Sequence, residues 1–253
     1  MTARIAAGIV SLGLSVGTLA CMDFYEVPVD VPIQAKLDVS MFKRVLVAGF
    51  LAGGSRAIDP NTETARLLRS QLRTKSDLKV IDADVLSLVD EMDRRATADL
   101  PISAAGNEGK IKNSKDMEAY EAIFNDKEFW KKIGEEYQSP LIVTGSVLFT
   151  EVSKSGMVST VAPTAGPDGI TTYREVQQFR DQKGFALDQK FVFIDGKTGS
   201  LLHSETLHSD TYYPSTQNTP ALSAYFELMD KVLPTFLTTL NTQRIRGTRI
   251  LIK

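Results

Sequence analysis

Arg44-Val-Leu-Val-Ala-Gly-Phe50 and Pro140-Leu-Ile-Val-Thr-Gly-Ser-Val-Leu-Phe149 are the two stretches that decide the fold class of this chain. Both are almost continuously apolar, and such runs predict strands buried on both faces of a sheet. Between them, Asp59 and Pro60 supply an N-cap and a first-turn proline, which open a helix. Strands that alternate with helices predict an α/β fold, in which helices pack on a mixed β-sheet.

The same signals predict the other elements. Strands are expected at residues 78–82, 173–180, 187–195, 200–212 and 249–252, and helices from Asp84, at 116–124, at 127–138 and from Pro220. Residues 97–115 are expected to form an exposed loop. The predicted core includes Trp130, Val143 and Phe226. Residues 44–253 are expected to form one domain.

Three of these segments resemble a known family. Val45-Leu-Val-Ala-Gly-Phe50, Lys79-Val-Ile-Asp82 and Leu141-Ile-Val-Thr-Gly-Ser146 are similar to strands of the periplasmic α/β domain shared by the curli-secretion lipoprotein, the penicillin-binding-protein activator lipoprotein and the TolB amino-terminal domain. The hairpin at 195–199 also matches. The resemblance covers about residues 40–245. It implies a two- or three-layer sandwich that serves as a binding or assembly domain, with no catalytic residues to carry over.

The start of the chain predicts export. Arg4 is followed by an uncharged, mainly apolar run that ends at Ala20, which is typical of a signal peptide at residues 1–20. Cys21, the only cysteine, follows at once and resembles the acylated cysteine of a bacterial lipobox, although Thr18 replaces the usual leucine. We therefore expect a lipid on Cys21, followed by a short extended tether over residues 21–43. The sequence also allows ordinary secretory cleavage.

The composition argues against nucleic-acid binding and against thiol chemistry. The formal net charge is −2 at pH 7, so no basic excess indicates nucleic-acid binding. Once Cys21 is acylated, no thiol remains for a disulfide, a nucleophile or a metal site. We expect neither cofactor nor metal ion.

Motifs for catalysis are incomplete. The Gly196-Lys-Thr198 triplet lacks the first glycine of a P-loop and lies between two predicted strands. Ser40-Met-Phe-Lys43 and Lys197-Thr-Gly199 match two of three motifs of serine β-lactamases, but Ser-Asp-Asn is missing. We expect no enzyme activity, with an exported serine hydrolase as a distant alternative.

Two further features have structural explanations. His203 and His208 are five residues apart, which places them on opposite faces of a strand and argues against a shared metal ion. The Gly53-Gly54 pair precedes a predicted helix and could hold an anion there, although a mobile surface loop is the simpler expectation.

Residues 153–172 separate two hypotheses of function. A pore-forming secretion lipoprotein would use residues 150–180 as a membrane hairpin, which requires alternate apolar positions. Neither phase of the segment is a continuous apolar row, so we predict a water-exposed loop or ribbon that meets a protein partner. The predicted contact residues are Met157, Val161, Ile170 and Tyr173. The favoured function is a non-catalytic envelope lipoprotein that faces the periplasm, in the outer membrane, with the inner membrane as the alternative.

Overall fold

The computed structural model describes residues 24–97, 111–165 and 169–252. The predicted signal peptide, Cys21 and most of the predicted loop at 97–115 lie outside the described residues. The chain divides into two units, Gln34–Gln243 and a smaller unit built from the two terminal segments. Each is described by itself.

The larger unit contains a sheet of five strands in the order β3-β2-β4-β5-β6. β2 runs parallel to β3 and β4, whereas β4, β5 and β6 are antiparallel neighbours. The predicted mixed α/β fold is confirmed, and β4 is central, as expected. The strands are β2 (Arg44–Gly54), β3 (Lys79–Ile81), β4 (Leu141–Ala165), β5 (Thr171–Asp195) and β6 (Leu201–Pro214).

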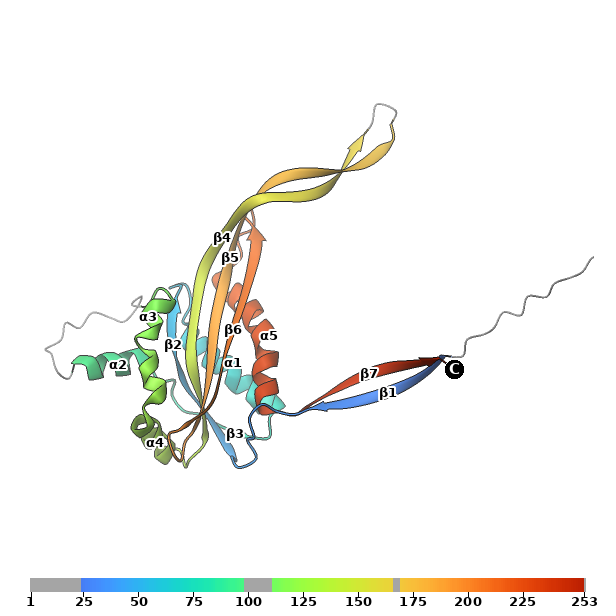
Figure 1. Cartoon of the computed structure of the whole chain (residues 1–253). Helices are drawn as coiled ribbons and strands as arrows, with labels where there is room; N and C mark the ends of the chain where they lie inside the picture. The colour runs from blue at the N-terminus through green and yellow to red at the C-terminus, as the bar shows by residue number, and fades with distance from the viewer. Residues whose placement is uncertain (1–23, 98–110, 166–168, 253) are drawn as a thin grey trace, which may run out of the picture. The chain divides into compact units, whose positions relative to one another are not determined.

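Helices cover both faces of this sheet (Figure 1). α1 (Pro60–Lys75) and α5 (Ala221–Leu240) contribute to one apolar cluster with Val143, which is fully buried as predicted. The opposite cluster contains Trp130 on α4 (Lys127–Glu136), together with α2 (Leu88–Thr97), α3 (Ser114–Glu118) and the 3₁₀ helix η1 (Glu121–Asn125). Trp130 is fully buried, and its indole N–H donates to the carbonyl of Ile123 over 2.8 Å.

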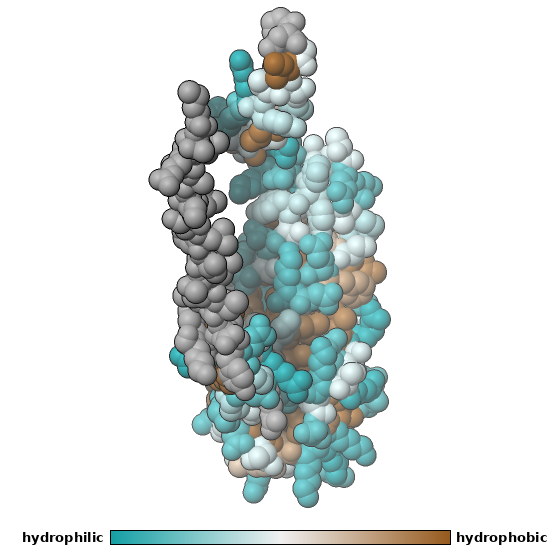
Figure 2. All heavy atoms as spheres, turned by 90° about the vertical axis from the view of Figure 1, so that its right-hand side faces the viewer, coloured by the Kyte–Doolittle hydropathy of each residue, from teal (hydrophilic) through white to brown (hydrophobic). Residues whose placement is uncertain are grey.

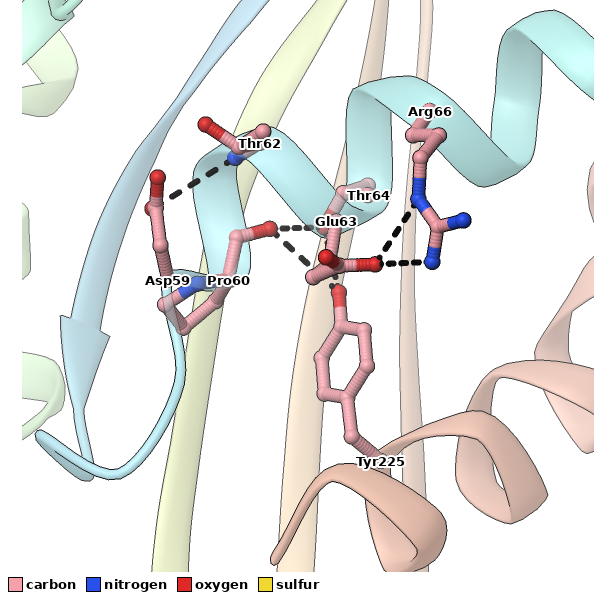
Figure 3. A network of polar contacts seen from close by, with 7 residues as sticks. All are labelled: Asp59, Pro60, Thr62, Glu63, Thr64, Arg66 and Tyr225. Carbon is pink, nitrogen blue, oxygen red and sulfur yellow. Dashed lines mark hydrogen bonds and ion pairs between the residues drawn. The ribbon is translucent and has the colours of Figure 1, made fainter.

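The start of α1 is fixed by the predicted cap and by a tyrosine from α5 (Figure 3). The Asp59 carboxylate accepts the amides of Asn61 and Thr62 at 3.1 and 3.4 Å. The buried Tyr225 hydroxyl lies 2.5 Å from the Thr64 hydroxyl, which donates to the carbonyl of Pro60. Burial raises the pKa of Tyr225 far above its ordinary value, so this phenol stays neutral and ties α5 to α1.

Two helical predictions need correction. α2 begins at Leu88 and not at Asp84, because the amide of Leu86 donates to Ala48 at the edge of β2 and Ser87 takes the cap position. On α5, Phe226 is only partly buried beside the core, because the helix presents Tyr225, Leu228 and Met229 to the sheet.

The turn at 195–199 is built for close packing. Asp195 accepts the Lys197 amide at 2.9 Å and the Thr198 hydroxyl at 2.8 Å. α4 rests directly on this turn, since a Cβ added to Gly134 would lie 1.7 Å from the carbonyl oxygen of Gly196. The match to catalytic and nucleotide-binding motifs therefore has a structural explanation in hairpin geometry.

The smaller unit is a two-stranded ribbon of β1 (Phe24–Ile33) and β7 (Gln243–Ile252). The strands run in opposite directions (Figure 1). The extended conformation predicted for residues 21–43 thus occurs at 24–33, where it is paired with the end of the chain. β7 is longer than the strand predicted at 249–252.

Candidate interaction site

The main candidate is a projecting arm made of the outer halves of β4 and β5. β6 accompanies β5 only as far as the pair Gln182–Pro214. Beyond it, residues 155–165 and 171–181 pair only with each other, in unbroken antiparallel register as far as Ala165–Thr171. At about 3.4 Å per residue, this arm reaches roughly 35 Å past the sheet. The segment predicted as a loop or ribbon is a ribbon.

One face of the arm, which we call its apolar face, combines residues from both strands. Met157 lies directly opposite Phe179, Pro163 opposite Tyr173, and Val161 opposite Glu175. Met157, Val161, Tyr173 and Phe179 are 62%, 63%, 74% and 64% exposed. Two carboxylates lie on the same face: Asp181, opposite Ser155 at the base of the arm, and Glu175, which accepts the Ser159 hydroxyl at 2.5 Å. Three of the four predicted contact residues therefore share this face, and Ile170 lies in the connection at the tip, also exposed.

The opposite face of the arm, its basic face, has a different character. Arg180 lies opposite Gly156 and Arg174 opposite Ala162, with Lys154 closer to the body. Val158 and Val176 are the large apolar residues here, and both are less exposed, at 40% and 39%. The two faces thus differ in charge and hydrophobicity, and Figure 2 shows brown patches on the arm among hydrophilic atoms.

An isolated two-stranded ribbon with a bare apolar face is marginal in water. Scattered exposed apolar residues are ordinary, but four large ones on one face of a projecting element, interrupted only by the polar residues around Ser159 and Glu175, are typical of an interaction surface. Phe179 was missed as a contact residue because it is far from Met157 in sequence. Only the register brings the two side chains together.

The Gly53–Gly54 expectation is corrected. Both glycines belong to the end of β2, where the Gly54 amide donates to Ile111 and the Ser55 amide donates to Phe149. A Cβ on Gly54, whose φ is +95°, would lie 1.9 Å from the carbonyl oxygen of Phe149. These glycines serve close backbone packing in a strand and not a mobile loop, and the Gly54 amide is already hydrogen-bonded.

The residues of the candidate serine hydrolase motifs are not joined by hydrogen bonds. The amide of Ser40 donates to Asp38 at 2.9 Å, and hydrogen bonds from Ser40 hold the pKa of the Asp38 carboxyl below its ordinary value. Within the described chain, Ser40, Lys43 and Lys197 make no hydrogen bond to one another. The absence of enzyme activity stays a prediction.

The two histidines lie on opposite faces of β6, as predicted. His203 is opposite Phe193 on the α5 side, with ring centroids 6.0 Å apart. His208 is opposite Asp188, and its Nδ1 lies 2.6 Å from that carboxylate. Among residues 24–97, 111–165 and 169–252, no group of three or more His, Cys, Asp or Glu side chains is arranged to hold a metal ion.

A hollow in the surface was not anticipated from the sequence. It has a volume of about 420 Å³ and lies between α2 and α4, over Phe129 and Ile133. Phe129 also lines a neighbouring hollow, where the guanidinium of Arg95 covers the Phe129 ring at 4.5 Å and binds Asp126 at 2.5 Å. Burial alone would raise the pKa of Asp126, but hydrogen bonds from Phe129 and Arg95 bring it below its ordinary value. The mixed lining does not define a ligand class, so we assign the hollow no function.

Comparison with known proteins gives only distant likenesses. No family model and no curated protein matches the chain. Among solved structures, a dodecamer of a PelC variant from Paraburkholderia phytofirmans is similar, with 12% identity, coverage of 85% of this chain and 98% of that one, and a TM-score of 0.36. A putative neuraminyllactose-binding hemagglutinin homolog from Helicobacter pylori has 9% identity, coverage of 79% and 83%, and a TM-score of 0.39.

Lipoprotein GNA1162 from Neisseria meningitidis has 13% identity, coverage of 76% and 96%, and a TM-score of 0.27. Likenesses this low transfer neither function nor assembly to this chain. The specific resemblance to the curli-secretion, synthase-activator and TolB domains stays a prediction. Within the described residues, no helix is long and apolar enough to cross a membrane.

Proposed function

We propose that this chain is a non-catalytic bacterial envelope lipoprotein that binds a protein partner through the apolar face of its arm. In this proposal a lipid on Cys21 holds it on the periplasmic side of the outer membrane. The observation that carries the proposal is the row formed by Met157, Val161, Tyr173 and Phe179, which is exposed along a ribbon with no cover from the sheet. Each large apolar side chain removed from water would contribute about 1.5–3 kcal/mol.

A pore-forming hairpin has the right shape but lacks a lipid face. Glu175 interrupts the apolar face, while Arg174 and Arg180 occupy the other face. A cation that faces lipid at mid-membrane costs about 2–4 kcal/mol, and a carboxylate somewhat less. Whichever face met lipid would therefore carry a charge near its centre, which favours a protein partner in water over a bilayer.

The test is site-specific photo-crosslinking in cells, with a benzophenone amino acid in place of Tyr173 in the full-length chain. We expect one discrete adduct, identifiable by mass spectrometry. Met157→Ser with Phe179→Ser should lower its yield several-fold. Val158→Ser with Val176→Ser is the matched control, because it removes two apolar residues from the basic face. Equal yields from the two pairs would contradict the assigned face.

A deletion separates partner binding from pore formation. Removing residues 156–170 and bridging the ends with Gly-Ser should leave the sheet folded and monomeric, because these residues lie beyond the part of β5 that pairs with β6. Partner capture should be weakened. A detergent-stable ring that conducts ions, and that loses conductance on this deletion, would establish the pore hypothesis instead.

A further inference from the structure

The β1–β7 ribbon has a defined register. Its two strands run in opposite directions and each contains 10 residues (Figure 1). Asp30 is seventh from the start of β1 and Arg246 is seventh from the end of β7, and their side chains form an ion pair at 3.6 Å. The ion pair and the equal strand lengths indicate a register in which the first residue of β1 lies opposite the last residue of β7, and Val27 lies opposite Arg249.

This register sorts the ribbon into two unlike faces, because side chains alternate along a strand. Val27, Val29, Val31 and Ile33 fall on one face, together with Arg249 from β7. Val29, Val31 and Ile33 are 36%, 52% and 43% exposed. We call this the valine face.

The carboxylates of the ribbon lie on the other face. Glu26 and Asp30 share it with Arg246, and both acids are exposed. Pro28 and Pro32 occupy the positions between and beyond them, and Ile250, which is 60% exposed, lies opposite Glu26 on this face. The valine face thus carries a cation and, over residues 26–33 and 246–250, no carboxylate.

We propose that the valine face lies in the interfacial layer of the lipid bilayer, with the Arg249 guanidinium on lipid phosphate groups. This inference rests on the anchoring of Cys21 in the proposed function. Phe24 opens β1 three residues after Cys21, so the ribbon begins within about 11 Å of the acylated residue even when the connection is fully extended. The tether holds the ribbon at the membrane surface and gives it a high effective concentration there.

The depth of this contact is limited by the backbone. A two-stranded ribbon leaves the outer N–H and C=O groups of both strands unpaired, and hydrocarbon cannot satisfy them. Interfacial elements instead bury an apolar face only about 5–10 Å deep, where water and headgroups still reach polar atoms. The ribbon therefore lies on the membrane and does not span it.

A second copy of the chain is a poorer occupant of this face. Two valine faces packed together would enclose an arginine from each copy without any carboxylate in the residues described above, and an unpaired buried charge is strongly unfavourable. Phosphate groups supply the missing anion. Arginine is suited to them because its planar guanidinium donates two parallel hydrogen bonds.

The experiment measures binding of the full chain carrying Cys21→Ser, purified from the periplasm, to vesicles of phosphatidylethanolamine and phosphatidylglycerol by co-sedimentation. Without an acyl chain, binding reports on the protein surface alone. Arg249→Gln should lower the partition coefficient about fivefold at low salt. Arg246→Gln makes the same charge change on the opposite face and should leave it nearly unchanged.

The apolar contribution is tested with isosteric changes. Val29→Thr with Val31→Thr keeps the strand β-branched and should weaken binding about tenfold or more. Pro28→Thr with Pro32→Thr is the control on the opposite face. No vesicle binding by the Cys21→Ser chain, equal losses in each matched pair, or a dimer dissociated by the valine changes would each overturn the proposal.

Failure of this proposal is distinguishable from failure of the proposed function. The Tyr173 adduct reports on the arm alone, and fractionation of Cys21→Ser reports on the anchor alone. Vesicle binding with no Tyr173 adduct would leave the ribbon inference standing and refute the partner-binding arm.

Discussion

Trp130→Ala provides the most direct test of how α4 packs on the sheet. The indole is fully buried in the cluster on the α4 side, contacts Phe129 edge-on with ring centroids 4.9 Å apart, and donates to Ile123. Truncating a buried tryptophan costs about 3–5 kcal/mol, and the orphaned carbonyl adds about 1 kcal/mol. This is a large part of a total stability of about 5–15 kcal/mol. We expect the melting temperature to fall by roughly 8–24 °C, at about 2–4 °C per kcal/mol.

Circular dichroism is the appropriate assay, because Trp130 is the only tryptophan and its fluorescence disappears with the substitution. The control is Trp130→Phe, which keeps most of the volume but removes the N–H donor and part of the ring. It should cost about 1–2 kcal/mol from the unsatisfied carbonyl and the smaller ring. An unchanged melting temperature for Trp130→Ala would refute the packing of α4 described above.

Four further outcomes are expected. Cys21→Ser should move the protein from the membrane fraction to the soluble periplasm in cell fractionation, and equal retention would contradict acylation. Tyr225→Phe should lower the free energy of unfolding, measured by urea denaturation, by about 1 kcal/mol, because it removes the hydroxyl that hydrogen-bonds to α1. Gly134→Ala should lower stability by more than about 1 kcal/mol, since its Cβ would overlap the turn below, and a neutral effect in the same assay would exclude that contact. Burial alone would raise the pKa of Glu205, but hydrogen bonds from Lys36 and Thr239 lower it below its ordinary value. The ionised Glu205 side chain therefore contributes its full stabilisation above about pH 4.5, and this contribution is lost as the pH falls through the lowered pKa of Glu205. Acid-unfolding curves of Glu205→Gln should lack this contribution.

The elements predicted correctly from sequence are those with local signals. β2 and the first part of β4 are recognisable as apolar runs, and α1 begins at the expected Asp59 cap. α2 was misplaced because two caps, Asp84 and Ser87, lie three residues apart, and only a hydrogen bond to β2 decides between them. Such a contact between distant segments has no trace in local sequence.

Pairing over long distances explains the larger omissions. The outer half of β4 contains Pro163 and is mostly polar, so its composition is typical of a loop although its backbone is a strand. β1 was predicted as extended, but its partner β7 lies more than two hundred residues away, beyond the reach of periodicity. On the apolar face of the arm, only Phe179 was missed, because it lies on the other strand from Met157 and only the register brings the two together.

The core of the sheet fixes which residues the arm presents. β4 and β5 run without interruption from buried pairs such as Val143–Phe193 to Met157–Phe179 on the arm. A slip of one residue would turn Val143 and Phe193 away from their core cluster, and such a flip of every side chain is strongly disfavoured in a buried sheet. The exposed ribbon therefore inherits its register from the core, although its own polar sequence specifies register only weakly. Its apolar face is set before any partner arrives, so less conformational entropy is lost on binding, and the arm is suited to specific recognition.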